Sequence, residues 1–364
     1  MRTLVIKFIG CLLAVGSGLP AGPEAPMIHL GAMCGRAISA HDSLLAWLGK
    51  KIPPLEKVLI LFRNERDARD FVTAGTAAGV ASAFGAPVGG VLFALEELSS
   101  SWTPSLTYAL DGLTPLLRPP RPSKATVRVS RERRWKILLT SMTAATVPYV
   151  LISAFADLED GGVFDGTIER EAIEFYQAET SVNNVAVIIP AMCIGVVAGA
   201  IAAGFTGANM RMIGWRKRRI AHTPWRRVAE PMVVMLVLVG LTVGLSALYG
   251  CTPVARADPL IAQHLVGLHC ENGEYNELAT LLYTPGGQTI KNLWSRHYVD
   301  GHGRETFGAP ALLILLAVYM PLACWLAGTI VPTGLIVPVL LIGATIGRTL
   351  TGPTTSFFRY CVSE

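Results

Sequence analysis

The chain alternates between long stretches without charge and short charged connections. Six stretches contain no Asp, Glu, Lys or Arg: residues 8–23, 72–95, 137–156, 182–210, 231–250 and 306–347. A membrane-spanning helix needs about 20 consecutive apolar residues, so most of these stretches can cross a bilayer. The last one has room for two crossings or for broken, re-entrant segments. The pattern therefore predicts an all-α polytopic membrane protein.

Gly and Pro interrupt several of these stretches. In VTAGTAAGVASAFGAPVGG (72–90), Ala86-Pro87 predicts a helix break, so residues 72–98 should form two short helices rather than one rod. The small residues of this stretch, and the Gly195/Gly199 pair further along, favour close helix packing in lipid. The sequence GLIVP (334–338) predicts a second break, inside 306–347.

Composition also indicates a membrane protein, and the placement of charges predicts how the chain is oriented in the membrane. The 364 residues are 51% hydrophobic and 16% charged, whereas soluble domains carry about 25% charged residues. Residues 118–136 hold eight basic residues and one acid, and residues 211–227 hold seven basic residues and no acid. Residues 157–179 hold eight acids and one Arg. The positive-inside rule places both basic segments in the cytosol, and the acidic segment on the other side.

The same parity makes the loop 251–305 luminal or extracellular. Nucleic-acid binding is the weaker interpretation of the basic segments, because they are short and flanked by membrane stretches; we expect no nucleic-acid partner. Four parts are expected along the chain: membrane segments in 1–102, a basic, Pro-containing cytosolic linker or insertion in 103–135, membrane segments in 136–350, and a divergent tail in 351–364. The first residues, with Arg2, Lys7 and an apolar stretch, also resemble a signal peptide.

The seven cysteines fall into different environments. Cys11, Cys193 and Cys324 lie in apolar stretches and are expected to be packing residues. Cys251 and Cys270 both lie in the predicted luminal loop, a compartment that permits disulfides. They are a disulfide candidate, and two free thiols are the alternative.

Three features carry candidate chemistry: Glu24 within GPEAP (22–26), the pair Glu96-Glu97, and the break at 334–338. An ionisable residue in a membrane protein is by default a functional-site hypothesis. Interrupted helices expose N–H groups and a partial positive charge that suit a desolvated anion. A carboxylate in such a place mimics an anion: ionised it occupies the site, and protonated it withdraws.

Each feature has a structural alternative. Glu96-Glu97 could end a helix at the membrane surface, the 334–338 break could be a packing kink, and Glu24 could lie in a loop after a cleaved signal peptide. His29 is more simply a packed, hydrogen-bonded residue than a catalytic one. The sequence has no HExxH, P-loop or Cys/His cluster with metal spacing. We therefore expect no metal, no cofactor and no enzyme activity.

Four blocks resemble a known family, in the family's order: GPEAPMIHLGA (22–32), DFVTAGTAAGVASAFGAPVGGVLFALEE (70–97), CENGEYNELATLLY (270–283) and LACWLAGTIVPTGLIVPVLLIGATIGR (322–348). They resemble the CLC family of chloride channels and chloride/proton exchangers, and look most like its eukaryotic endosomal-lysosomal branch. The resemblance spans roughly residues 1–100 and 135–350. It implies a CLC-type fold with broken and re-entrant helices.

The resemblance also implies roles. Glu24 corresponds to the gating glutamate and Glu97 to the internal proton-transfer glutamate, whose presence favours exchange over a passive voltage-gated channel. The implied anion-binding positions are Gly22, Ala25, Leu335, Ile336 and Val337. The implied partners are chloride, protons, membrane lipid and a second copy of the chain, in an endosomal, lysosomal or vacuolar membrane.

Departures from the family pattern qualify these roles. Pro23 replaces a Lys or Arg and removes a backbone N–H near the external anion site. Ala25 replaces Gly, and Ile336 replaces Phe. GSGLP (16–20) imitates the motif that supplies the family's central-site serine, but it directly precedes Glu24, so Ser17 is rejected for that role. The serine motif, the late helix with the family's pore tyrosine and the CBS domains are all missing. We therefore expect an incomplete fold that is truncated at both ends. A subunit that does not transport is a further hypothesis.

Overall fold

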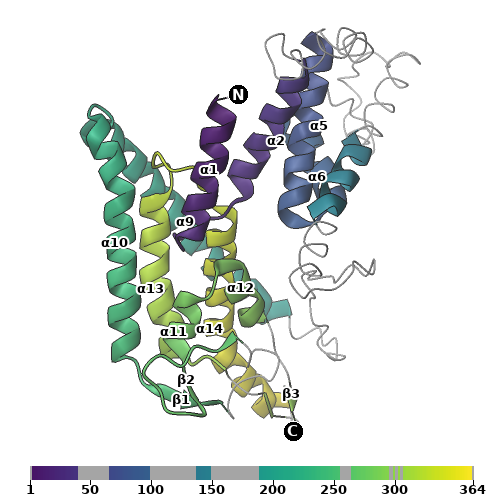
Figure 1. Ribbon diagram of the computed structural model, residues 1–364. Coiled ribbons are helices and arrows are strands. Elements are labelled where there is room, and N and C mark those ends of the chain that lie inside the picture. Colours follow the sequence, from purple (N-terminus) through teal and green to yellow (C-terminus); the bar gives the residue numbers. More distant parts are fainter. Residues whose placement is uncertain are drawn as a thin grey trace, which may run out of the picture. The chain divides into compact units, whose positions relative to one another are not determined.

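The computed structural model describes residues 2–39, 65–98, 137–148, 188–254, 264–294, 298–299, 302–303 and 306–362 (Figure 1). The predicted linker 103–135 and the acidic segment 157–179 lie outside these residues. The chain divides into two units. The first comprises Met1–Ile9 and Glu24–Ala172, and the second comprises Gly10–Pro23 and Ile173–Glu364.

The first unit is built from short helices. They are α2 (Glu24–Ser39), α5 (Glu65–Phe84), α6 (Pro87–Phe93), a π-helical turn at Ala94–Leu98 and a helix at Ile137–Pro148. Pro87 opens α6, where a proline needs no N–H donor. The predicted break at Ala86-Pro87 is therefore confirmed, and residues 72–98 do not form one rod.

Helices α2 and α5 approach each other through interlocking glycines. Gly31 and Gly35 of α2 face α5, and Gly75 and Gly79 of α5 face α2. A Cβ atom added at Gly75 would overlap the carbonyl group of Gly31, and one added at Gly79 would lie 2.6 Å from the Met27 oxygen. Small residues allow this backbone-to-backbone packing in lipid. The expected role of this Gly/Ala-rich stretch in packing is confirmed, whereas Gly195 and Gly199 meet no described atom within 4 Å of an added Cβ.

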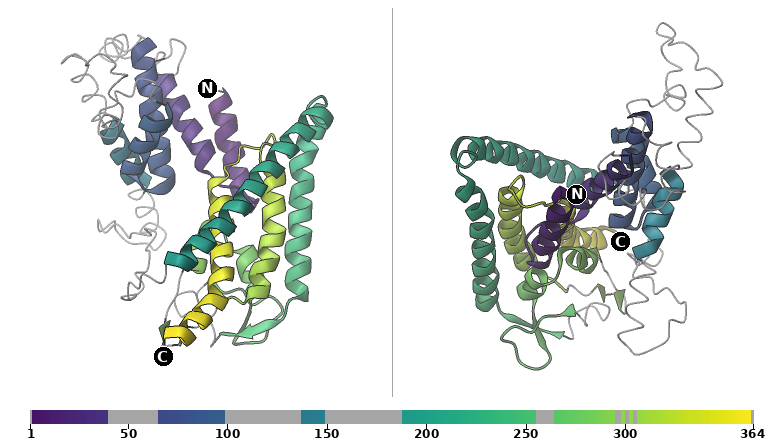
Figure 2. Two further views of the ribbon diagram at one scale, coloured as in Figure 1. Left: turned by 180° about the vertical axis from the view of Figure 1, so that it is seen from behind. Right: turned by 45° about the horizontal axis from the view of Figure 1, so that its top comes forward.

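The second unit is a bundle that contains the longest described helices. It contains the end of α1 (Arg2–Gly16), then α9 (Ile188–Arg219), α10 (Pro224–Leu248), α13 (Ala309–Leu326) and α14 (Ile336–Val362). Phe205 of α9 is buried with Ala323 of α13 and Ile346 of α14. In Figure 2, α9 lies obliquely across α13 and α14. The break predicted inside 306–347 is confirmed, since nine residues separate the end of α13 from the start of α14.

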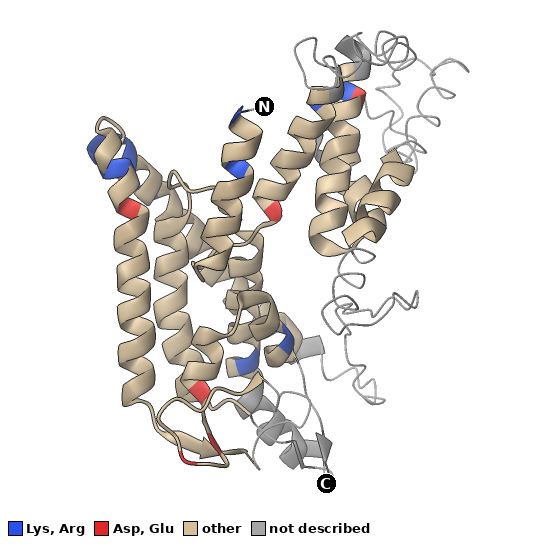
Figure 3. Ribbon diagram, in the orientation of Figure 1, with Lys and Arg blue, Asp and Glu red and all other residues tan. Residues whose placement is uncertain are grey.

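Three described helices are long and apolar enough to cross a membrane: Ala191–Arg219, Pro224–Leu248 and Ala309–Leu326. Figure 3 shows basic residues gathered at the turn between α9 and α10, while α13 carries no charge. α14 continues through the sequence that we separated as a divergent tail. The expectation of an all-α polytopic membrane protein is confirmed.

A small polar cap joins α10 to α13 within the second unit. It contains the antiparallel strands β1 (Cys251–Pro253) and β2 (Glu274–Asn276), then α11 (Glu277–Tyr283), α12 (Gly286–Trp294), and the short strands β3 (Tyr298–Val299) and β4 (His302–Gly303). Asn276 caps α11, because its Oδ1 accepts from the Ala279 N–H at 2.9 Å. Its Nδ2 donates to the Ser246 carbonyl at 2.8 Å, which ties the cap to the end of α10.

Cys251 and Cys270 form a disulfide in this cap, with Cα atoms 5.8 Å apart. Replacing both by serine should lower the thermal unfolding temperature, because a cross-link across 19 residues stabilises by about 3 kcal/mol in the chain-entropy model. Unfolding followed by fluorescence in detergent tests this. Cys193→Ser, at an exposed free thiol of α9, is the control. An unchanged unfolding temperature in the double variant would contradict the stabilising role.

Candidate functional site

The connection between α1 and α2 is an ordered turn. The Gly18 N–H donates to the Val15 carbonyl at 3.1 Å, and Gly18 has a φ of 75°, which closes α1. The Ser17 hydroxyl donates to the Ala14 carbonyl of the same helix at 2.9 Å. Leu19 and Ala21 pack against the cluster formed by Val234 of α10 and Leu322 of α13. Leu19 and Ala21 therefore anchor the turn on the core of the second unit, and the Ser17 hydroxyl is used within α1.

The turn ends in a two-residue bridge to the start of α14. The Gly22 N–H donates to the Gly334 carbonyl at 2.9 Å, and the Gly334 N–H donates to the Gly22 carbonyl at 2.8 Å. A helix begins two residues after each glycine, α2 at Glu24 and α14 at Ile336. Each helix has a proline at its third position. The two sequence motifs that we singled out are thus joined through their glycines.

The start of α14 presents unused backbone donors. In the part of the chain that the structure describes, the N–H groups of Leu335, Ile336 and Val337 donate to no backbone carbonyl. The first N–H groups of a helix have no intrahelical acceptor, and they carry the positive end of the helix dipole. Pro338 contributes no donor. The three preceding amides are the positions that the resemblance assigns to anion binding.

Glu24 lies in the first turn of α2 and is 3% exposed. A carboxylate there interacts favourably with the positive end of the helix dipole. The neighbouring Pro23 and Pro26 supply no N–H donors, so the Glu24 and Ala25 amides are the first that this helix start offers. The anion-binding and gating roles of these residues remain predictions.

Glu97 lies in the π-helical turn that follows α6, a type of distortion frequent at functional sites. Its side chain is outside the described part of the structure. The adjacent Glu96 is exposed. The choice of Glu97 rather than Glu96 as the proton-transfer residue therefore rests on the resemblance alone.

His29 is a hydrogen-bonded residue of α2: its Nδ1 accepts from the Lys7 ammonium, within the first unit. Neither residue belongs to a group of three or more His, Cys, Asp or Glu side chains that could hold a metal ion, and no such group is found among the described residues. The expectation of a hydrogen-bonded His29 is confirmed, but the expectation of a packed residue is wrong, because its side chain is exposed.

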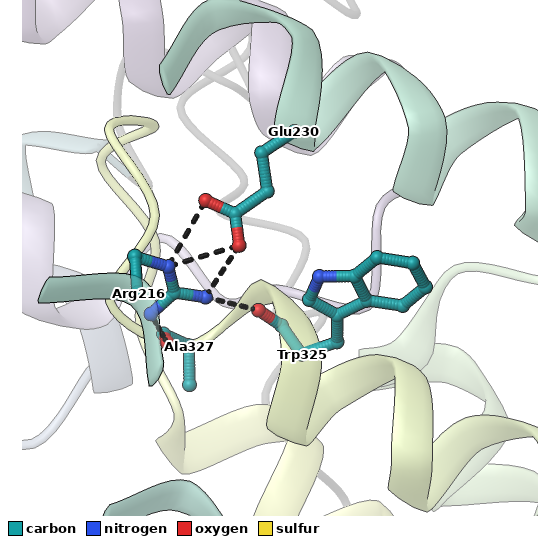
Figure 4. A network of polar contacts seen from close by, with 4 residues as sticks. All are labelled: Arg216, Glu230, Trp325 and Ala327. Atoms are coloured by element: carbon teal, nitrogen blue, oxygen red, sulfur yellow. Dashed lines mark hydrogen bonds and ion pairs between the residues drawn. The ribbon is translucent and has the colours of Figure 1, made fainter. Parts of the chain in front are cut away.

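Sequence reasoning missed a buried ion pair between Arg216 of α9 and Glu230 of α10 (Figure 4). The Arg216 Nε lies 2.9 and 3.0 Å from the two Glu230 oxygens, and the Nη2 lies 2.9 Å from Oε1. The two side chains are 11% and 4% exposed. A signal was present in the sequence, because Glu230 is the single acid between residues 180 and 257 and follows a basic segment.

A second buried carboxylate, Glu277, lies in the polar cap. Its Oε1 accepts from the Thr252 hydroxyl at 3.0 Å, and its Oε2 accepts from the Gly308 N–H at 2.8 Å. Burial, and then the Glu277 charge, raise the pKa of Tyr249. Gly308 is the N-cap of α13, so Glu277 places a negative charge at the positive end of that helix.

The chain is similar in sequence to known proteins over almost its whole length. The family described as "Voltage gated chloride channel" matches residues 1–362. "Chloride channel protein C" of Dictyostelium discoideum is 29% identical over 98% of the chain and 42% of its own length. "Chloride channel protein CLC-d" of Arabidopsis thaliana is 31% identical over 95% and 40%, and "H(+)/Cl(-) exchange transporter 7" of Homo sapiens is 32% identical over 96% and 38%.

The chain thus spans about two fifths of the length of these curated relatives. The match confirms the resemblance read from the four sequence blocks. Together with the three candidate spans, it makes the chain an integral membrane protein. The chain belongs to the voltage-gated chloride channel family.

Proposed function

We propose that this protein transports chloride across a membrane and exchanges it for protons. The observation that carries the proposal is the Gly22–Gly334 bridge, which ties the residues just before Glu24 to the residues just before the open amides of α14. The relatives named as chloride channels and as a chloride/proton exchange transporter support transport rather than catalysis.

Chloride would bind at the start of α14, where the Leu335, Ile336 and Val337 amides have no backbone acceptor among the described residues. Backbone dipoles attract an anion without a full opposing charge, so the ion can also leave, as conduction requires. The Gly22 N–H donates to the Gly334 carbonyl and is therefore not available to chloride. Gly22 would instead contribute to anion binding indirectly, by holding Gly334 in place through the bridge. The Ala25 amide is the corresponding donor on α2.

Glu24 would gate this path. Ionised, its carboxylate competes with chloride for helix-start amides; protonated, it loses the charge that holds it there. One side chain would then couple proton and chloride occupancy. Glu97 would deliver protons from the cytosolic side. These roles are taken over from the family motif by position.

Flux in liposomes tests the proposal. We expect the purified protein to drive proton movement when a chloride gradient is imposed, and Glu97→Gln to abolish proton movement while chloride still flows. A pH-sensitive dye and a chloride electrode, read on the same vesicles, measure the two fluxes. Chloride flux without proton movement in the unmodified protein would leave a passive channel, and no chloride flux from well-folded protein would refute transport.

Dimerisation and location complete the proposal. The family resemblance supports a homodimer with one pathway in each subunit, and an endosomal, lysosomal or vacuolar membrane. The transport role supports the absence of enzyme activity and of nucleic-acid binding. Light scattering in detergent would test the dimer.

A further inference from the structure

The Arg216 guanidinium binds the carboxyl end of α13 as well as Glu230 (Figure 4). Its Nη2 donates to the Trp325 carbonyl at 2.7 Å, and its Nη1 donates to the Ala327 carbonyl at 3.0 Å. The last carbonyls of a helix have no intrahelical donor, and a cation there is favoured by the helix dipole. Arg216 therefore caps α13 from a different helix.

This guanidinium has little left to bind an ion. Of its five N–H groups, the Nε and one Nη2 donor go to Glu230, and the other Nη2 donor and one Nη1 donor go to α13. The Glu230 charge balances the Arg216 charge. Arg216 is thus suited to hold a structure in place rather than to carry chloride.

Helix α13 is held at both ends by buried charges that match its dipole. Glu277 accepts from the Gly308 N–H at its amino end, and Arg216 donates to two carbonyls at its carboxyl end. Between these ends the helix carries no charged residue. Only the carboxyl end of α13, where Arg216 binds, is followed along the chain by α14. The Glu277 cap lies at the other end of α13, away from this connection.

The segment from Ala327 to Gly334 connects the Arg216 cap to the open amides of α14. Gly328 has a φ of 79°, and a Cβ added there would lie 3.2 Å from the Arg216 Nη1. Further along, Pro332 lies against Gly10 of α1, where an added Cβ would be 3.2 Å away. The segment ends in the Gly334 bridge to Gly22.

We propose that Arg216, held by Glu230, is a positioning residue that fixes the segment 327–334 and thereby the amides of Leu335–Val337. Its consequence for chloride rests on the proposed function. The positioning itself is a property of the second unit and can be measured without transport.

Hydrogen exchange measures the positioning directly. The Thr329, Gly334 and Val339 amides donate to Leu326, Gly22 and Leu335 at 3.1, 2.8 and 2.9 Å, so they report on this segment. We expect the double variant Arg216→Met/Glu230→Leu to speed their exchange about tenfold, because local opening becomes easier when the cap is lost. Replacing both charges avoids leaving one buried and unpaired. Gly328→Ala keeps both charges and should act in the same direction, because it strains the backbone at a positive φ and crowds the guanidinium.

Glu277→Gln is the matched control, because it removes the charge and one of the two acceptor oxygens at the opposite end of the same helix. It should speed exchange at Gly308 and leave the Thr329, Gly334 and Val339 amides unchanged. In liposomes, the double variant should weaken the apparent affinity for chloride by about tenfold, since small misplacements of binding groups have large effects, while Glu277→Gln should not.

Unchanged exchange at Gly334 and Val339 in the double variant would overturn the positioning role, whatever Gly328→Ala does. Faster exchange with unchanged chloride affinity would overturn its link to the anion path. If the unmodified protein moves no chloride, the proposed function fails, and hydrogen exchange still decides whether Arg216 positions the segment.

Discussion

Replacing Glu24 by alanine is expected to stop proton movement while chloride flux continues and loses its dependence on pH. Alanine can neither compete with chloride for the amides at a helix start nor carry a proton, so both sides of the proposed coupling disappear together. Glu24 is buried in the first turn of α2, where the dipole favours its charged form. Parallel proton and chloride flux measurements over a range of pH provide the test.

Glu24→Gln and Glu96→Gln sharpen this result. Glutamine keeps the shape of the side chain but has no charge to titrate, so it should behave like alanine in proton movement. Glu96 is an exposed acid of the same unit, and its replacement should leave both fluxes intact. Coupled transport that survives Glu24→Ala would show that this carboxylate is not the gate.

Replacing Gly75 by leucine is expected to unfold or severely destabilise the first unit. A side chain at this position meets the backbone of α2 at Gly31 rather than a flexible side chain, so no rotamer change can make room. Overpacking a well-packed contact typically costs about 1–3 kcal/mol, and occasionally more; a backbone overlap belongs at the upper end. The thermal unfolding temperature and the monodisperse fraction in detergent measure the effect.

Gly240→Leu is the matched control. Gly240 lies in the interior of α10, and a Cβ added there meets no described atom within 4 Å. The same change in side-chain size and in backbone entropy should then leave stability unchanged or slightly improved. Equal losses in the two variants would show that the α2–α5 contact is not the cause.

The sequence was most informative where local chemistry decides the structure. Proline needs no N–H donor where a helix begins, so the break before Pro87 and the break at 334–338 could be predicted. Pro231 and Pro321 lie inside α10 and α13, so a proline alone does not mark a break. The absence of charge over about 20 residues identified the spans because lipid offers charges no solvation. Both rules need only a residue and its neighbours along the chain.

The rest depends on which segments meet. The glycines of α5 indicated close packing, but the sequence of residues 72–90 does not show that Gly31 and Gly35 of α2 are their partners. Arg216 stands among several similar basic residues, and only the approach of α10 and α13 selects it from Arg218 and Arg219. The Gly22–Gly334 bridge joins two motifs that the sequence showed separately. The candidate site is formed by contacts between segments that are distant in sequence, and local sequence patterns do not reveal such contacts.

The Gly22–Gly334 bridge also sets an order for biogenesis. Residues 10–23 pack with helices of the second unit that leave the ribosome up to roughly 300 residues after them. Until α10 and α13 have been inserted, Leu19 and Ala21 have no core to enter. The segment that precedes α2 therefore reaches its final place only after helices that are made much later than itself.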